Sequence, residues 1–286
     1  MSKKVNVLTA FLVFVILTLI ILFYASSSAV RVLGVFICFC GFCLWWFIQY
    51  REQLKQARIQ RYKINANDRF WLEKNIPFYA ALNKKQKKVF EDRIGLFLSE
   101  IKVTQVDVKE DVKEVGFYVA SAAVITFWGL PYWNYGDLSE VLVYSENFNN
   151  SFEVSKKHTI QGQVYHGGLM NSTMSLSLSA LKLGFNNDTD KKNVGVHEFA
   201  HLLDKEDGSI DGLPFMMNKE MRAEWATIAE REMDKIEKGK SDINSYASTN
   251  SAEFFAVLTE YYKERPKLLS RKHPEIYEMM NKVFNH

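Results

Sequence analysis

Residues 193–204 read NVGVHEFAHLLD and contain the pattern H-E-x-x-H, with His197 and His201 at its ends. The apolar residues of this stretch recur at spacings of three and four: Val196, Phe199, Ala200 and Leu203. Such spacing is typical of a helix with one buried face. We predict a helix over roughly residues 190–206, ended by Gly208. Three residues before it offer N-cap oxygens: Asp188, Thr189 and Asp190.

The two histidines lie four residues apart, so a helix would place both imidazoles on one face. That arrangement suits a single zinc ion, and Glu198 could act as the general base on water held by the metal. The pattern indicates zinc-assisted hydrolysis of an amide bond. Because it can also arise by coincidence in a chain with six histidines, a true site needs a third ligand and a substrate-binding edge.

A second apolar stretch supplies candidates for the third ligand. From about Ser251 the sequence predicts another helix, closed by Pro266. Glu253 lies at its start, where burial of a carboxylate is costly without a cation such as zinc. It also lies three residues after Asn250, so the two could form a capping box instead. Glu260, two turns further along the same face, is a rival ligand, and the residues alone leave the choice open.

Three motifs carry a family resemblance: V-H-E-F-A-H-x-L-D at Val196–Asp204, D-G-x-P at Asp211–Pro214, and Y-A-x-x-x-x-A-E-x-F-A-V-L-x-E-Y at Tyr246–Tyr261. From roughly Phe70 to Arg271 the chain resembles the Mlc titration factor A family of zinc metallopeptidases. The third motif also resembles the catalytic region of anthrax lethal factor. The resemblance implies an α+β, zincin-like (gluzincin) domain with one Zn²⁺ per chain.

In both relatives the third ligand is the glutamate seven residues after a tyrosine. The resemblance therefore implies that His197, His201 and Glu253 hold the zinc and that Glu260 lies beside a ligand. Tyr246 is then the tyrosine, whose phenol could donate to a developing oxyanion. An ordinary half-buried tyrosine is the alternative.

Asp204 lies one helical turn after His201. It could orient a ligand or hold the following loop, as carboxylates around metal sites do. Alternatively, it is a helix-end residue with no part in zinc binding. The sequence favours neither interpretation.

Residues 173–180 alternate apolar and polar side chains, which is typical of a half-buried strand. The resemblance to zincin-type peptidases implies that a strand at this place is the sheet edge on which an extended peptide lies. A paired inner strand is the alternative. The predicted edge residues are Ser175, Leu176, Ser177, Leu178 and Ser179. Residues 140–144 and 161–165 are further strand candidates. We expect a small, mostly antiparallel sheet beside the zinc helix.

Two apolar runs lie near the N-terminus, at Val5–Tyr24 and Val30–Ile48, and only Arg31 interrupts the second. Each is long enough to cross a hydrocarbon core of about 30 Å at about 1.5 Å per residue. They predict a two-helix transmembrane hairpin, in which residues 5–48 bind the membrane. A cleaved signal peptide fits less well, because the first run is too long and a second follows at once.

Positive charge predicts the orientation of this hairpin. Lys3 and Lys4 precede it, and five basic residues follow it: Arg51, Lys55, Arg58, Arg61 and Lys63. The positive-inside rule then places both ends in the cytoplasm. All three cysteines lie in the second run, so the rest of the chain needs no disulfide. We expect a multi-pass protein of a bacterial inner membrane with its catalytic domain in the cytoplasm.

The sequence thus predicts a hairpin over residues 1–50, a basic linker over 51–66 and a metallopeptidase domain over 67–286. We expect a peptide or protein substrate. A net charge of +3 gives no reason to expect a nucleic-acid partner. The alternative is a membrane-tethered binding protein that sequesters a transcriptional repressor, with structural zinc. A repressor partner is implied by the family resemblance only, and the hairpin departs from the soluble members of that family.

Overall fold

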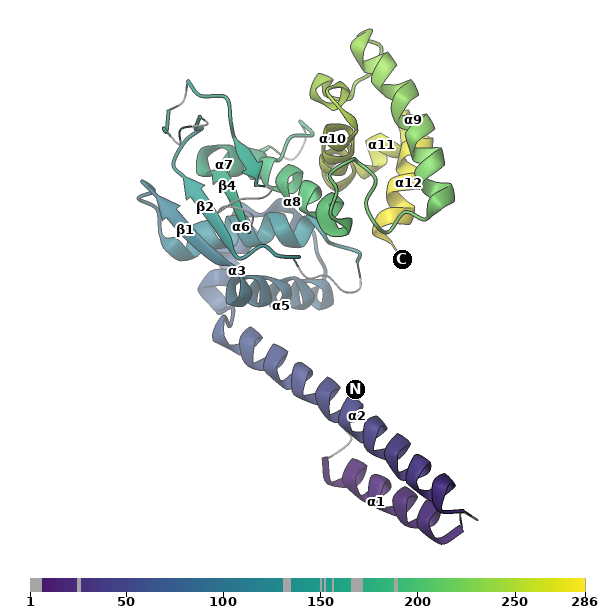
Figure 1. The fold of residues 1–286 in the computed structure, drawn as a ribbon. Coiled ribbons are helices and arrows are strands. Elements are labelled where there is room, and N and C mark those ends of the chain that lie inside the picture. Colours follow the sequence, from purple (N-terminus) through teal and green to yellow (C-terminus); the bar gives the residue numbers. More distant parts are fainter. Residues whose placement is uncertain are drawn as a thin grey trace. The chain divides into compact units, whose positions relative to one another are not determined.

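The computed structural model (Figure 1) describes residues 7–24, 27–130, 135–149, 151, 153–155, 157–165, 172–187 and 190–285. The chain divides into two compact units, Met1–Gln60 and Arg61–His286.

The first unit contains two helices, α1 (Val7–Tyr24) and α2 (Ser28–Arg61). They contact each other through Phe14 and Phe42, whose ring centroids lie 5.1 Å apart. One helical segment of the described residues, Ser28–Arg51, is long and apolar enough to cross a membrane, and α1 offers a shorter apolar run. Val5 and Asn6, the start of the first expected span, lie outside the described residues.

The second unit is α+β and mostly helical. Its N-terminal half contains α3 (Ala66–Asn75), α4 (Pro77–Ala80), α5 (Lys84–Glu100), β1 (Lys102–Val106), α6 (Val112–Thr126), β2 (Glu140–Tyr144), β3 (Gly162–Val164) and β4 (Thr173–Ser177). Its C-terminal half contains α7 (Leu178–Asn186), α8 (Val194–Asp204), η2 (Lys205–Asp207), α9 (Lys219–Glu237), η3 (Ser245–Ser248), α10 (Ser251–Glu264), α11 (Pro266–Lys272) and α12 (Pro274–Phe284).

The sheet has the order β1-β2-β4-β3. β1 pairs with β2, and β2 with β4, in parallel, and only β3 is antiparallel to its neighbour β4. The expectation of a mostly antiparallel sheet is therefore wrong. The reason is the connection between β1 and β2, which contains α6. A helical crossover brings the chain back to the end of the sheet at which the first strand began, so the next strand runs parallel to the first.

The predicted edge strand is an inner strand. β4 lies between β2 and β3, so Ser175, Leu176 and Ser177 are paired on both sides. Leu178 and Ser179 belong to α7, because the Ser177 Oγ accepts a hydrogen bond from the Ala180 N–H at 3.3 Å and caps that helix. Among the described strands, β3 forms the edge next to β4.

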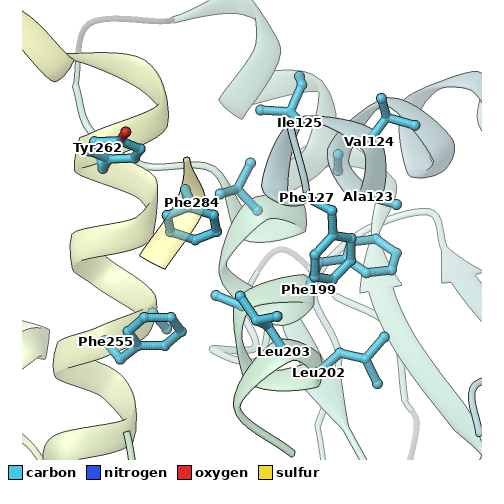
Figure 2. Packing of buried hydrophobic residues seen from close by; sticks show 14 of the residues in the cluster. Ala123, Val124, Ile125, Phe127, Phe199, Leu202, Leu203, Phe255, Tyr262 and Phe284 are labelled. Carbon is cyan, nitrogen blue, oxygen red and sulfur yellow. The ribbon is translucent and has the colours of Figure 1, made fainter. Parts of the chain in front are cut away.

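Helix α8 lies between the sheet-side elements and the C-terminal helices (Figure 1). One face of α8 meets α6 and the other meets α10 (Figure 2). Phe199 and Leu203 are fully buried between these helices, as are Phe127 and Phe255. Replacing such a phenylalanine with alanine costs about 3–5 kcal/mol. The histidine pattern therefore stands on one of the best-packed elements of the fold.

Helix α8 begins later than predicted. Asn193 is its N-cap, and the Asn193 side chain accepts a hydrogen bond from the Val196 N–H at 3.1 Å. Asp190 cannot take this role, because Lys191 adopts a left-handed conformation with φ of 64°. Asp188 and Thr189 lie outside the described residues. At the other end, Gly208 closes the η2 turn with φ of 93°.

Candidate metal centre

Helix α8 places His197 and His201 on one face, as the four-residue spacing predicts. Their Nε2 atoms lie 3.2 Å apart, and both side chains are only 11–12% exposed. Two neutral imidazoles that both carry their proton on Nδ1 would point lone pairs at each other in this arrangement. A cation between the two nitrogens removes that conflict.

Helix α10 brings Glu253 to the same point. The Glu253 Oε2 lies 2.9 Å from the His197 Nε2 and 3.4 Å from the His201 Nε2. Asn250 caps the helix by accepting a hydrogen bond from the Glu253 N–H. The Glu253 side chain, however, contacts the histidines and does not return to Asn250, so the capping box is not formed. This geometry agrees with Glu253 as the third ligand.

The separations of the three ligand atoms fit a small tetrahedral ion. Atoms about 2.0–2.1 Å from zinc at the tetrahedral angle lie roughly 3.3 Å apart. The observed separations of 2.9, 3.2 and 3.4 Å lie around that value. In the part of the chain that the structure describes, these three residues are the one group with the geometry to hold a metal ion.

Glu260 contacts the opposite nitrogen of the first histidine. Its Oε1 lies 2.8 Å from the His197 Nδ1, and its Oε2 accepts a hydrogen bond from the Asn193 N–H. With Nδ1 as donor to this carboxylate, the lone pair of His197 lies on Nε2 and faces Glu253. Glu260 thus lies beside a candidate ligand, at the edge where α10 packs on the start of α8.

The site attracts positive charge. Burial lowers the pKa of His197, but its contacts with Glu253 and Glu260 outweigh burial and raise the pKa well above the ordinary value. For Glu253 the balance is the reverse: burial raises the pKa, and the two histidines lower it well below the usual range. Burial raises the pKa of Glu198, which lies beside both histidines. Three carboxylates around two imidazoles form a place for a cation.

Asp204 holds the loop that follows α8. Its Oδ2 accepts a hydrogen bond from the Gly212 N–H at 2.7 Å. The side chain is fully buried, and burial raises its pKa to about 6. The Asp204 Oδ1 and the His201 Nδ1 are both buried without a partner among the described residues. Asp204 therefore acts on the D-G-x-P loop rather than directly on a histidine.

Tyr246 borders the three ligand residues from η3. Its ring centroid lies 5.9 Å from that of His197, and the side chain is 52% exposed. Partial burial and the neighbouring Glu253 raise the pKa of its phenol. The group therefore stays protonated at neutral pH and can donate a hydrogen bond toward the cleft.

A cleft of about 1090 Å³ opens onto this site. Its walls come from β3, α7, the start of α8 and the η3–α10 segment, and its lining includes Glu198 and Tyr246. The volume is slightly above the range of about 300–1,000 Å³ for small-molecule pockets. Gly162 lies on β3 against Glu198 and was not among the predicted site residues. A lone glycine in a predicted strand was the available signal, because it marks a close approach.

Comparison with known proteins agrees with this site. A family model described as glucose-regulated metallo-peptidase M90 matches residues 50–285. An uncharacterized protein of Synechocystis sp., slr2042, is 27% identical over 222 residues, which cover 73% of this chain and 80% of that protein. Mlc titration factor A of Enterobacter sp. is 33% identical over 99 residues, 32% of this chain and 37% of that protein.

Mlc titration factor A of Serratia proteamaculans is 27% identical over 136 residues, 43% of this chain and 52% of that protein. The chain thus spans about a third to a half of the Mlc titration factor A proteins that it matches. The family model extends over nearly the whole second unit, including both helices that supply the metal-binding group. The chain therefore belongs to the glucose-regulated metallo-peptidase M90 family.

Proposed function

We propose that this protein is a membrane-anchored zinc peptidase whose catalytic domain faces the cytoplasm. The observation that carries the peptidase assignment is the convergence of three ligand atoms, two imidazole Nε2 and one carboxylate oxygen, within 3.4 Å of one another. Two histidines and one glutamate are a ligand set of catalytic zinc, which leaves a position open for water. His197, His201 and Glu253 would hold the ion.

The chain's own residues divide the remaining work. When bound, zinc would supply Lewis-acid activation of water and of the substrate carbonyl. Glu198 takes a proton from the attacking water and delivers it to the leaving amine. Its raised pKa suits a group that must both accept and release a proton. Tyr246, protonated at neutral pH, donates a hydrogen bond to the oxyanion.

Glu260 and Asp204 would hold a ligand and a neighbouring loop in place rather than take part in the reaction. Glu260 keeps the Nε2 lone pair of His197 directed at the metal position through its contact with Nδ1. Asp204 fixes the loop at Gly212. Neither residue would contact the substrate.

An extended peptide would lie along β3. The Ser177 N–H donates to the Gln161 carbonyl at 2.7 Å, and the Tyr165 N–H donates to the Thr173 carbonyl at 3.3 Å. Hydrogen-bonding directions alternate along an antiparallel strand, so the backbone groups of Gly162 and Val164 point away from β4. An added strand could pair with them. This proposal replaces the segment Ser175–Ser179 as the substrate edge.

The N-terminal helices would form the anchor. Ser28–Arg51 has the length and composition of a membrane span, and α1 contacts α2 through an aromatic pair. We infer a hairpin over residues 1–50, a basic linker over 51–66 and a catalytic domain over 67–286. The excess of basic residues on both flanks supports cytoplasmic ends at a bacterial inner membrane.

The test of catalysis is Glu198→Gln in the full-length protein, assayed on an internally quenched peptide library with and without a chelator. We expect the parent to cleave and the variant to retain its zinc but lose at least about 10²-fold in turnover. Equal cleavage by both would refute the role of Glu198. If neither cleaves any peptide while a repressor still binds, the protein is a binding protein rather than a peptidase.

A further inference from the structure

Gly162 on β3 lies directly against the side chain of Glu198. A Cβ atom placed on Gly162 would lie 2.5 Å from the Cγ, 2.8 Å from the Cδ and 2.7 Å from the Oε1 of Glu198. Non-bonded carbon atoms at optimal separation are about 3.5–4.0 Å apart. Any residue other than glycine at this position would therefore occupy the space that the Glu198 side chain fills.

The contact matters because it positions the Glu198 side chain by packing. The side chain is buried, with 6% of its surface exposed. Its Cγ, Cδ and Oε1 are the nearest atoms to a Cβ at position 162, and the carboxylate lies beside His197 and His201. A general base needs lone pairs free for the water that it deprotonates. Packing against the backbone of Gly162 can position such a base without using those lone pairs.

The backbone of Gly162 adds a second constraint. Its N–H and C=O point away from β4, toward the open side of the sheet, because Gln161 and Tyr165, one and three positions away, hydrogen-bond to β4 and the directions alternate along the strand. The same residue therefore borders both Glu198 and the edge on which a peptide would lie. Its position sets the distance between the base and an extended substrate.

We propose that Gly162 is a positioning residue for the general base. Because position 162 of the edge strand carries no side chain, the Glu198 carboxylate can occupy this space beside the scissile bond. This inference rests on the proposed role of Glu198. It predicts that a single methyl group at position 162 would displace the base while the metal ligands stay in place, because the nearest atoms to that methyl all belong to Glu198.

The predicted cost falls on catalysis and not on folding. The three atoms that would clash, Cγ, Cδ and Oε1, all belong to the Glu198 side chain and none to the backbone, so a rotation about its χ1 can relieve the clash. Gly162 has no positive φ, so alanine suits its backbone. A displacement of about 1 Å in a catalytic group can cost about 10²-fold in rate.

The experiment is a double-mutant cycle of Gly162→Ala and Glu198→Ala in the full-length protein in detergent. The readouts are melting temperature, zinc bound per chain, and kcat and KM on the library peptide that the parent cleaves fastest. We expect Gly162→Ala to keep its zinc and its KM, to melt within about 4 °C of the parent, and to lose about 10²-fold in kcat. The matched control is Gly116→Ala, which places a Cβ 3.2 Å from the flexible end of Leu98 and should keep its kcat.

The double-mutant cycle distinguishes a role of Gly162 in positioning Glu198 from a general structural role of Gly162. In the Glu198→Ala background the clashing atoms are gone, so Gly162→Ala should lower neither the melting temperature nor the residual kcat. Equal losses in both backgrounds would overturn the inference, as would unchanged kcat in the single variant or loss of zinc. If the single variant Gly162→Ala fails to fold, the inference predicts that the double variant with Glu198→Ala folds. A double variant that also fails to fold would contradict the inference.

Failure of the inference can be told apart from failure of the proposed function. If Glu198→Gln abolishes cleavage while Gly162→Ala leaves kcat intact, Glu198 is the base but Gly162 does not seat it. If the parent cleaves no peptide, or if Glu198→Gln cleaves normally, both proposals fall.

Discussion

At the scale of single residues, the imidazole of His197 is the centre of the site. Glu253 contacts its Nε2 and Glu260 contacts its Nδ1, at 2.9 and 2.8 Å. The two glutamates are seven residues apart on α10, about two helical turns, and so lie on one face. Their chemistry is identical, and the sequence alone could not separate a ligand from a supporting group. The two glutamates are distinguished by the nitrogen of His197 that each contacts, Nε2 for Glu253 and Nδ1 for Glu260.

The two glutamates should therefore differ in their effect on metal affinity. We expect Glu253→Ala to remove most of the bound zinc, because it deletes a ligand. Glu260→Gln should weaken zinc binding by about 10- to 100-fold, as for other partners of ligand histidines. Competition with a fluorescent chelator measures both affinities. A larger loss in Glu260→Gln than in Glu253→Ala would reverse the assignment.

At the scale of elements, the loop that follows α8 contacts both helices that carry the ligands. Asp204 at the end of α8 binds the Gly212 N–H, and the Trp225 indole donates to the Gly212 carbonyl at 2.9 Å. Gly212 also packs on the start of α10, since a Cβ there would lie 2.2 Å from the Ser251 carbonyl oxygen. The D-G-x-P motif thus sets the spacing between α8 and α10.

Gly212→Ala should be strongly destabilising for two reasons. Its φ of 77° disfavours a side chain, and the added methyl would overlap Ser251. We expect a loss of about 2–4 kcal/mol in the free energy of unfolding, together with weaker zinc binding. Gly208→Ala is the matched control, because its φ is 93° but nothing lies within 4 Å of the added methyl. It should cost only about 1–2 kcal/mol. Chemical denaturation of both variants checks this, and equal losses would exclude a contact with α10.

The elements divide into those the sequence could predict and those it could not. α8 and α10 were predictable because apolar periodicity is a local signal, as are Asn250 and Pro266 at the two ends of α10. The group His197, His201 and Glu253 followed from helical spacing together with family resemblance. The N-cap Asn193 was missed, because the left-handed turn at Lys191 that delays α8 has no local signature in a lysine.

The order of the strands could not be predicted from the sequence for a different reason. The alternation in residues 173–180 continues past the point where the strand ends, because Ser177 is used as a helix cap. β3 has only three residues, and its partner is chosen by the packing of the whole sheet. Pairing partners are non-local, so the exchange of edge and inner strands could be found only from coordinates.

At the scale of the whole molecule, the chain combines a catalytic unit with an apolar N-terminal unit. Among the described residues all free cysteines, Cys38, Cys40 and Cys43, lie in α2. Residues 61–286 contain no cysteine and therefore no disulfide.

The proposed orientation predicts opposite signals from two reporter fusions. A periplasm-active phosphatase fused after residue 28 should be active, and the same enzyme fused to the C-terminus should be inactive, because basic residues hold both ends inside. A cytoplasm-active fluorescent reporter should give the converse pattern. An active phosphatase at the C-terminus would place the catalytic unit outside.

The convergence of α8 and α10 also has a consequence for folding. A bound ion would tie His201 to Glu253 across 52 residues of chain, closing a loop much as a covalent cross-link does. Closing such a loop restricts the unfolded chain, and metal-binding free energy then becomes folding free energy. Cellular reductants, which break disulfides, leave this tie intact. Depletion of the metal undoes it, so the lifetime of the protein in the cell would follow the supply of zinc.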